Sequence, residues 1–207
     1  MTAVIATPPS LSGHVEGMEV VGRRWRTGVL LLILADAAFV AALLFSYLYL
    51  RGLNTEDAWT AKGASIAAIW VGWALAGGLL LAAGAAWWAE VAIRGADRRR
   101  LVAAEGLGVL VVLACSVGQV LQLASFPFRM DSSSYASMTV LIAGANLFHL
   151  LLTLFIGLGL WNRARLGRFT SEEHWQVQLG RIWFVWVALA SVATALATSF
   201  VASPHVA

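Results

Sequence analysis

The chain has 207 residues, of which 60% are hydrophobic and only 12% are charged. In an ordinary soluble domain about a quarter of the residues are charged. The lower charged fraction of this chain, together with its mean hydropathy of +0.79, excludes such a domain. The formal net charge of +3 comes from arginine clusters between apolar runs, a pattern typical of topology signals and not of a nucleic-acid surface. The composition therefore predicts an integral membrane protein without a nucleic-acid partner.

Residues 1–23 are largely polar and carry prolines and glycines, and we interpret them as a flexible or surface-lying tail. The first apolar run follows at about residues 25–50, within RWRTGVLLLILADAAFVAALLFSYLYLR. A run of about 20 apolar residues is long enough to cross a bilayer as a helix. This run predicts the first transmembrane helix.

One carboxylate, Asp36, interrupts this first run near its middle. On insertion scales such a group costs roughly 2.5–3.5 kcal/mol, so we expect it to face protein or water and not lipid. One interpretation is a hydrogen bond to a neighbouring helix. The other is a place on a proton or ion route, or a contact with a partner subunit, and the residues leave both open.

Four further apolar runs lie at about residues 64–88, 101–126, 137–161 and 179–201. Each is near or above the length that spans a bilayer. Because the connections between the runs are short, we expect consecutive helices to pack as antiparallel neighbours. The prediction is an all-α, polytopic bundle of five transmembrane helices that forms one domain, residues 24–203.

The basic residues predict the orientation of this bundle. Apart from Arg51, Lys62 and Arg129, every Lys and Arg lies before or at the start of the first run, between the second and third, or between the fourth and the start of the fifth. Positively charged connections stay in the cytoplasm. We therefore expect a cytoplasmic N-terminus and a C-terminus on the outer side.

Two acidic residues accompany the arginines between the second and third runs. Glu90 precedes the cluster that includes Arg98 and Arg99, and Glu105 follows it by one to two helical turns. We interpret both glutamates as members of interfacial salt bridges. The alternative is that this charged group contacts lipid headgroups or a partner subunit.

Polar side chains inside the later runs recur at helical spacing. Gln119 and Gln122 share a face of the third run, while Asn146 and His149 begin a stripe on the fourth. Amides and imidazoles of this kind commonly bond between membrane helices, so we expect the two stripes to meet in one network. The pair Trp183 and Trp186 also shares a face, which we interpret as a packing, lipid or partner contact and not as a cofactor site.

His149 is the only histidine within an apolar run, and Cys115 is the only cysteine. A haem or copper site within the membrane needs at least two imidazoles or equivalent soft ligands. We therefore expect this chain to bind no haem or metal and to contain no catalytic residue. On the residues alone, it is an accessory or scaffolding bundle, or a small transporter that uses Asp36.

Several short motifs follow one another along residues 24–201. They are Ala35-Asp36, Gln119 with Gln122, FRMDSSSYAS (128–137), GANLFH (144–149), LGRFTSEEHW (166–175) and Trp183 with Trp186. In order and spacing they resemble subunit III of the haem–copper terminal oxidases, in its short bacterial form with five helices. Asp36 stands where that family has a membrane glutamate, and His149 matches the second histidine of a Gly-Phe-His-Gly-Leu-His motif. Asn146 replaces the first histidine, so the chain resembles a divergent member.

The resemblance implies a non-catalytic subunit in a bacterial cytoplasmic membrane, packed against oxidase subunits I and II. The haem and copper would lie in a partner subunit, and phospholipid would be a further ligand. The complex would reduce dioxygen to water with proton translocation, taking electrons from cytochrome c or from quinol. The alternatives are the corresponding subunit of a quinol oxidase or nitric oxide reductase complex, and a free-standing transporter or scaffold.

Overall fold

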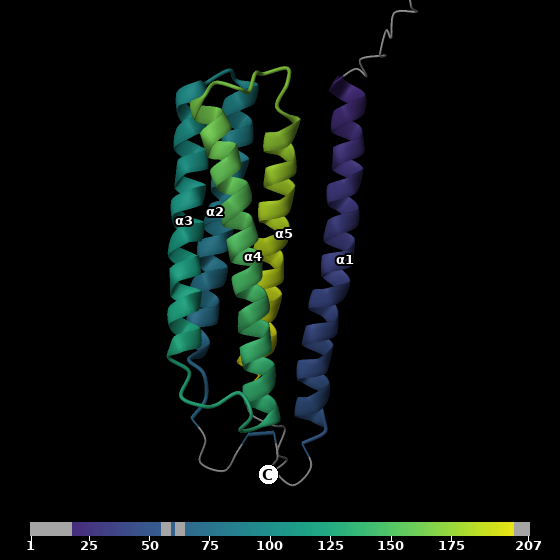
Figure 1. Cartoon of the computed structure of the whole chain (residues 1–207), viewed down its shortest axis with the longest axis vertical. Helices are drawn as coiled ribbons and strands as arrows, with labels where there is room; N and C mark the ends of the chain where they lie inside the picture. Colours follow the sequence, from purple (N-terminus) through teal and green to yellow (C-terminus); the bar gives the residue numbers. More distant parts are fainter. Residues whose placement is uncertain (1–17, 55–58, 61–64, 201–207) are drawn as a thin grey trace, which may run out of the picture.

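The computed structural model describes residues 18–54, 59–60 and 65–200. They form a bundle of five helices, each long and apolar enough to cross a membrane (Figure 1). The prediction of an all-α, multi-pass membrane protein is therefore confirmed. The helices are α1 (Met18–Gly52), α2 (Ile69–Arg94), α3 (Arg98–Ala124), α4 (Ser134–Arg165) and α5 (Trp175–Ser199).

The helices differ from the predicted runs at their ends. The first begins at Met18, within the segment interpreted as a tail, whose residues 1–17 lie outside the described part of the chain. The second begins at Ile69, later than the apolar run suggested. Hydropathy marks only the apolar part of a helix, whereas the backbone continues helically through polar turns such as Arg98 at the start of α3 and Arg165 at the end of α4.

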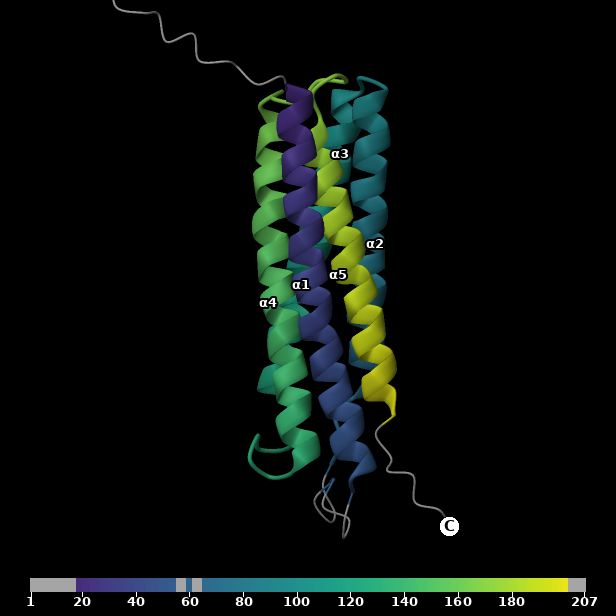
Figure 2. The same ribbon diagram turned by 90° about the vertical axis from the view of Figure 1, so that its right-hand side faces the viewer.

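Helices α2 to α5 form a closed four-helix bundle. In it, α2 packs against α3 and α5, and α4 also packs against α3 and α5. Helix α1 lies outside this bundle and contacts only α4 and α5 among the helices (Figures 1 and 2). Of the residues in the apolar segment of α1, 11% are buried, against 50% in the corresponding segment of α5. A small number of contacts therefore attaches α1 to the rest.

The basic residues gather at one end of the bundle, which we call the arginine-rich end. It contains the start of α1 and the connections α2–α3 and α4–α5, at the top of Figure 1. The opposite end contains the connections α1–α2 and α3–α4, and we call it the Trp59 end. The arginine-rich end carries Arg23, Arg24, Arg26, Arg94, Arg98, Arg99, Arg100, Arg163, Arg165, Arg168 and Arg181.

Local sequence explains where the helices begin. The α2–α3 connection is tight, because Ala96 adopts a left-handed φ of 55° and Asp97 then accepts a hydrogen bond from the Arg100 N–H at 3.0 Å. Ser133 begins α4 in the same way, accepting from the Ala136 N–H at 3.2 Å. Aspartate and serine are favoured at these positions because their side chains satisfy N–H groups that the first helical turn leaves unpaired.

Small residues let the four-helix bundle pack closely around α2. Most buried residues of α2 are alanines, and Gly108 of α3 lies against Ala85. Membrane helices associate through such close contacts because lipid provides no hydrophobic drive between them. Larger side chains fill the middle of the bundle, and aromatic rings fill the Trp59 end. There Tyr47 of α1 packs edge-on against Trp59 with ring centroids 5.1 Å apart.

Two glycines of α4 offer a matched test of this packing. A Cβ added at Gly157 would lie 3.2 Å from both Phe184 and Val109, whereas one at Gly159 meets no atom within 4 Å. We expect Gly157→Leu to lower the free energy of unfolding by about 1–3 kcal/mol through overpacking. Gly159→Leu is the control and should have little effect.

The single buried cysteine, Cys115, provides the measurement, because a thiol-reactive fluorophore labels it when the purified protein unfolds on heating. The expected result is an earlier labelling transition for Gly157→Leu alone. Equal transitions in the two variants would contradict the packing described for α3, α4 and α5.

Candidate functional site

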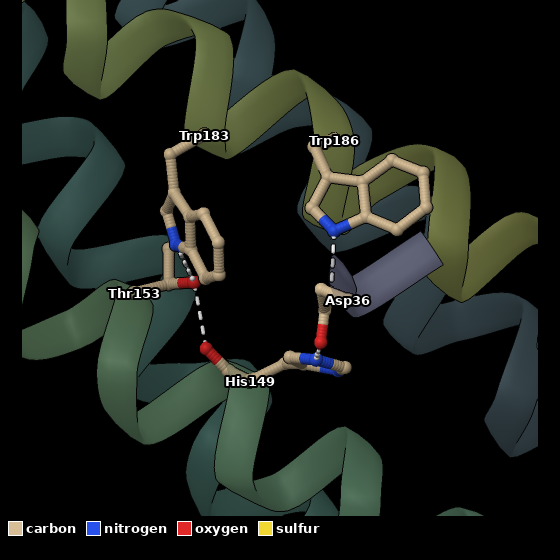
Figure 3. Close-up of polar contacts among 5 residues, drawn as sticks. All are labelled: Asp36, His149, Thr153, Trp183 and Trp186. Atoms are coloured by element: carbon tan, nitrogen blue, oxygen red, sulfur yellow. Dashed lines mark hydrogen bonds and ion pairs between the residues drawn. The ribbon is translucent and has the colours of Figure 1, made fainter. Parts of the chain in front are cut away.

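Asp36 of α1 is hydrogen-bonded through both carboxylate oxygens to the four-helix bundle. Its Oδ1 lies 2.9 Å from Nε2 of His149 on α4, and its Oδ2 accepts a hydrogen bond from the indole Nε1 of Trp186 on α5 at 2.6 Å (Figure 3). The side chain of Asp36 is 15% exposed and that of His149 is 4% exposed. One carboxylate therefore joins three helices.

A second pair of contacts holds the turn that carries His149. Trp183 Nε1 donates to Thr153 Oγ1 at 3.0 Å, and the Thr153 hydroxyl donates to the His149 carbonyl at 2.6 Å (Figure 3). The rings of Trp183 and His149 also meet edge-on, with centroids 6.5 Å apart. We call these residues, Asp36, His149, Thr153, Trp183 and Trp186, the Asp36 network.

The Asp36 network answers the energetic problem of a carboxylate within the membrane. An indole nitrogen can only donate, so Trp186 always offers its proton to Asp36. The imidazole of His149 donates from Nε2 when that nitrogen carries the proton, and it adds a counter-charge when both ring nitrogens are protonated. Paired and hydrogen-bonded in this way, the carboxylate avoids much of the cost of an isolated buried charge.

The network attaches α1 to the bundle, and it brings a carboxylate into contact with an imidazole, a pair of groups that can share a proton. A carboxylate and an imidazole in contact share a proton and can exchange it with a third group. The described residues contain no cluster of three or more His, Cys, Asp or Glu side chains that could hold a metal ion. The site is therefore described by its two titratable groups and their indole and hydroxyl partners.

The polar stripes of α3 and α4 lie near each other without a direct hydrogen bond between them. Gln119 Nε2 donates to Gln122 Oε1 at 2.7 Å within α3, and Asn146 Nδ2 points to Thr194 Oγ1 of α5 at 3.4 Å. His149 turns instead toward α1. The expected meeting of the two stripes thus becomes a shared cavity, lined by Gln119, Gln122 and Asn146.

The charged residues at the arginine-rich end are partly paired within the chain. Glu90 of α2, with a side chain 6% exposed, forms ion pairs with Arg94 of the same helix and Arg181 of α5. Arg98 donates to the carbonyl of Arg165, which joins the start of α3 to the end of α4.

Other expectations for this end differ from the structure. The salt bridge expected between Glu105 and the neighbouring arginines is not formed. Arg98 is engaged by the end of α4 and Arg100 pairs with Asp97, while the Glu105 side chain lies buried more than a helical turn away. Arg99 is exposed.

The tryptophans pack as expected and also have a role that the sequence does not reveal. Trp183 lies in the apolar core and Trp186 packs against it, and both indoles also donate hydrogen bonds to polar groups inside the membrane. The pairing of Asp36 with His149 had a detectable signal, because both residues fall at the middle of their apolar runs and hence at similar depth.

A comparison with models of protein families finds none that matches this chain. A search of curated proteins also finds no match. Function is therefore inferred from the geometry of the Asp36 network and from the order of the motifs along the chain.

A double-mutant cycle tests the pairing of Asp36 with His149. Because each single substitution leaves a buried polar partner behind, we expect Asp36→Ala and His149→Ala each to lower the free energy of unfolding by about 3 kcal/mol. The double variant should lose less than the sum of the two, by a coupling energy of about 1–3 kcal/mol. Chemical unfolding followed by Cys115 labelling provides the measurement.

The control cycle combines Asp36→Ala with Ser199→Ala. Ser199 lies at the far end of α5 and accepts a hydrogen bond from Trp73, outside the Asp36 network. These two effects should add. Additive effects for Asp36 and His149 as well would contradict a direct interaction between them.

The ion pairs of Glu90 give a separate test at the arginine-rich end. Glu90→Gln leaves Arg181, whose side chain is 26% exposed, without its anionic partner. We expect a loss of about 2 kcal/mol, below the 3–5 kcal/mol of a fully buried pair because both arginines reach solvent. The exposed Glu173→Gln is the control. Equal thermal stabilities of the two variants would show that the Glu90 contacts contribute nothing.

Proposed function

We propose that this chain is a non-catalytic subunit III of a haem–copper terminal oxidase in a bacterial cytoplasmic membrane. In this role it packs against subunits I and II, stabilises the catalytic subunit and supports proton uptake. The complex reduces dioxygen to water and couples this reaction to proton translocation. Haem and copper belong to the partner subunit, and phospholipid is a further ligand of this chain.

The meeting of three separate motifs in one network carries the proposal. The resemblance rests partly on Asp36 in the first run, His149 in the fourth and Trp183 with Trp186 in the fifth. These residues lie far apart in the sequence, yet they are hydrogen-bonded partners in space. A shared site gives a physical reason for these residue types to occur together in this order.

The arrangement of the arginines supports the proposed orientation. All of the arginine clusters lie at one end of the bundle, where they flank the starts of α1, α3 and α5. Since positively charged connections stay in the cytoplasm, we place the arginine-rich end inside. The N-terminus is then cytoplasmic, and the Trp59 end faces the outer side.

In this function Asp36 is a supporting residue and not a catalyst. Both of its carboxylate oxygens are engaged by partners from within the chain. The network keeps α1 in a fixed position against α4 and α5. It thereby presents a defined surface to subunit I.

The alternative of a free-standing transporter uses the same carboxylate as a coupling group. Transporters commonly bind their substrates where helices are interrupted near the middle of the membrane. All five helices of the described chain run without interruption. This continuity favours the subunit over the transporter.

Co-purification tests the proposal directly. A tag on this chain should retrieve a complex that contains haem and copper from solubilised native membranes, measured by reduced-minus-oxidised difference spectra and metal analysis. A tagged, unrelated membrane protein from the same host is the control. Retrieval of the chain without haem or copper would contradict the assignment.

Flux measurements separate the transporter from the subunit. We expect the isolated chain in liposomes to carry no proton or substrate flux. Asp36→Asn should instead lower the yield or the turnover of the purified complex several-fold, because it weakens the contact with His149. Asp131→Asn is the matched control, since Asp131 pairs with Arg129 on the surface outside the network. Flux that depends on Asp36 would establish the transporter.

A further inference from the structure

A small cavity lies within the four-helix bundle near the Trp59 end. Its volume is about 50 Å³, and all four helices contribute to its wall. Leu75 comes from α2, Gln119 from α3, Asn146 from α4 and Thr194 from α5. The cavity is partly open at the Trp59 end, and the polar side chains that the bundle buries in its wall need partners.

One of these side chains has an unsatisfied group. Gln119 is 1% exposed, and its Oε1 has no hydrogen-bond partner among the described residues. Its amide nitrogen is engaged by Gln122. Buried amide oxygens are almost always hydrogen-bonded, either to protein or to ordered water. Because Gln119 also lines the cavity, its unsatisfied oxygen is a group that a small donor held there would partner.

Other groups around the cavity complete a polar lining. Gln122, Asn146 and Thr194 all contribute to it, and the contact between Asn146 and Thr194 is long at 3.4 Å. The Tyr135 hydroxyl also lies in the wall and accepts a hydrogen bond from the Ala67 N–H at 2.9 Å. A bound water needs about two to four polar partners, and this lining supplies them.

The size of the cavity restricts its occupant. One buried water requires about 10–15 Å³ of such cavity volume, so a cavity of about 50 Å³ accommodates about four waters. We propose that the cavity is a bound-water site, in which a small cluster of waters donates to Gln119 and bridges to Gln122 and Asn146.

The position of Asn146 gives this site a consequence for the Asp36 network. Asn146 precedes His149 by three residues on α4, a rise of about 4.5 Å along the helix axis. The water cluster thus extends from the Trp59 end to about one helical turn from His149. It brings an exchangeable source of protons close to the only histidine in the membrane-spanning helices.

Hydroxyl-radical footprinting tests the proposal on the full chain in lipid nanodiscs. Brief X-ray pulses split water, and the radicals modify side chains that contact bound water. We expect modification of the lining residues Leu75 and Ile142, which are 8% and 3% exposed. The references are Leu79 and Phe184, which lie in the apolar core and match the 3% exposure of Ile142, and their modification should be at least about five-fold slower.

Gln119→Leu provides the matched variant, because it keeps the side-chain size and removes the unsatisfied oxygen. Modification of Leu75 and Ile142 should fall several-fold toward the reference rate. Ser116→Ala, whose hydroxyl bonds within α3 to the Val112 carbonyl, should leave the rates unchanged. Modification of Leu75 and Ile142 at the reference rate in the unaltered chain would overturn the proposal, as would unchanged rates in a folded Gln119→Leu variant.

Discussion

A carboxylate at the middle of a membrane must receive hydrogen-bond donors from the protein, and this requirement joins α1 to the rest of the molecule. Lipid offers no donor, and an isolated buried charge is costly. Here Trp186 donates to one oxygen and Nε2 of His149 lies at hydrogen-bond distance from the other, so the two partners come from two different helices. The position of α1 against α4 and α5 follows from satisfying both oxygens at once.

The rest of the bundle is held by a different kind of contact. Helices α2 to α5 pack mainly through alanines, glycines and large apolar side chains, and several polar contacts, such as Trp183 with Thr153 and Glu90 with Arg181, also join them. Helix α1 combines its polar attachment at mid-depth with aromatic contacts near both ends, through Trp25 against Trp175 and Tyr47 against Trp59. A protein built in this way has a closely packed four-helix part and a first helix whose placement depends on a few identifiable residues.

The sequence predicted the number and the approximate limits of the helices, because length and hydropathy report directly on membrane spans. It also identified Asp36, His149 and Asn146 as residues of interest, because polar groups are rare in such segments. It did not predict which helices would meet, since that depends on rotation of each helix about its axis. The hydrogen bond of Trp186 was not predicted for a related reason: an indole has both an apolar ring and a donor, and here the ring packs against the core while the donor binds Asp36.

Distance measurements between spin labels test the central claim most directly, namely that the Asp36 network fixes α1 against α5. With Cys115→Ala as background, labels at the exposed Leu34 of α1 and Leu189 of α5 should give a narrow distance distribution. Asp36→Leu should broaden it and shift it to longer distances, while a pair at Leu81 of α2 and Leu189 stays unchanged. An unaltered α1–α5 distribution in Asp36→Leu would contradict the account.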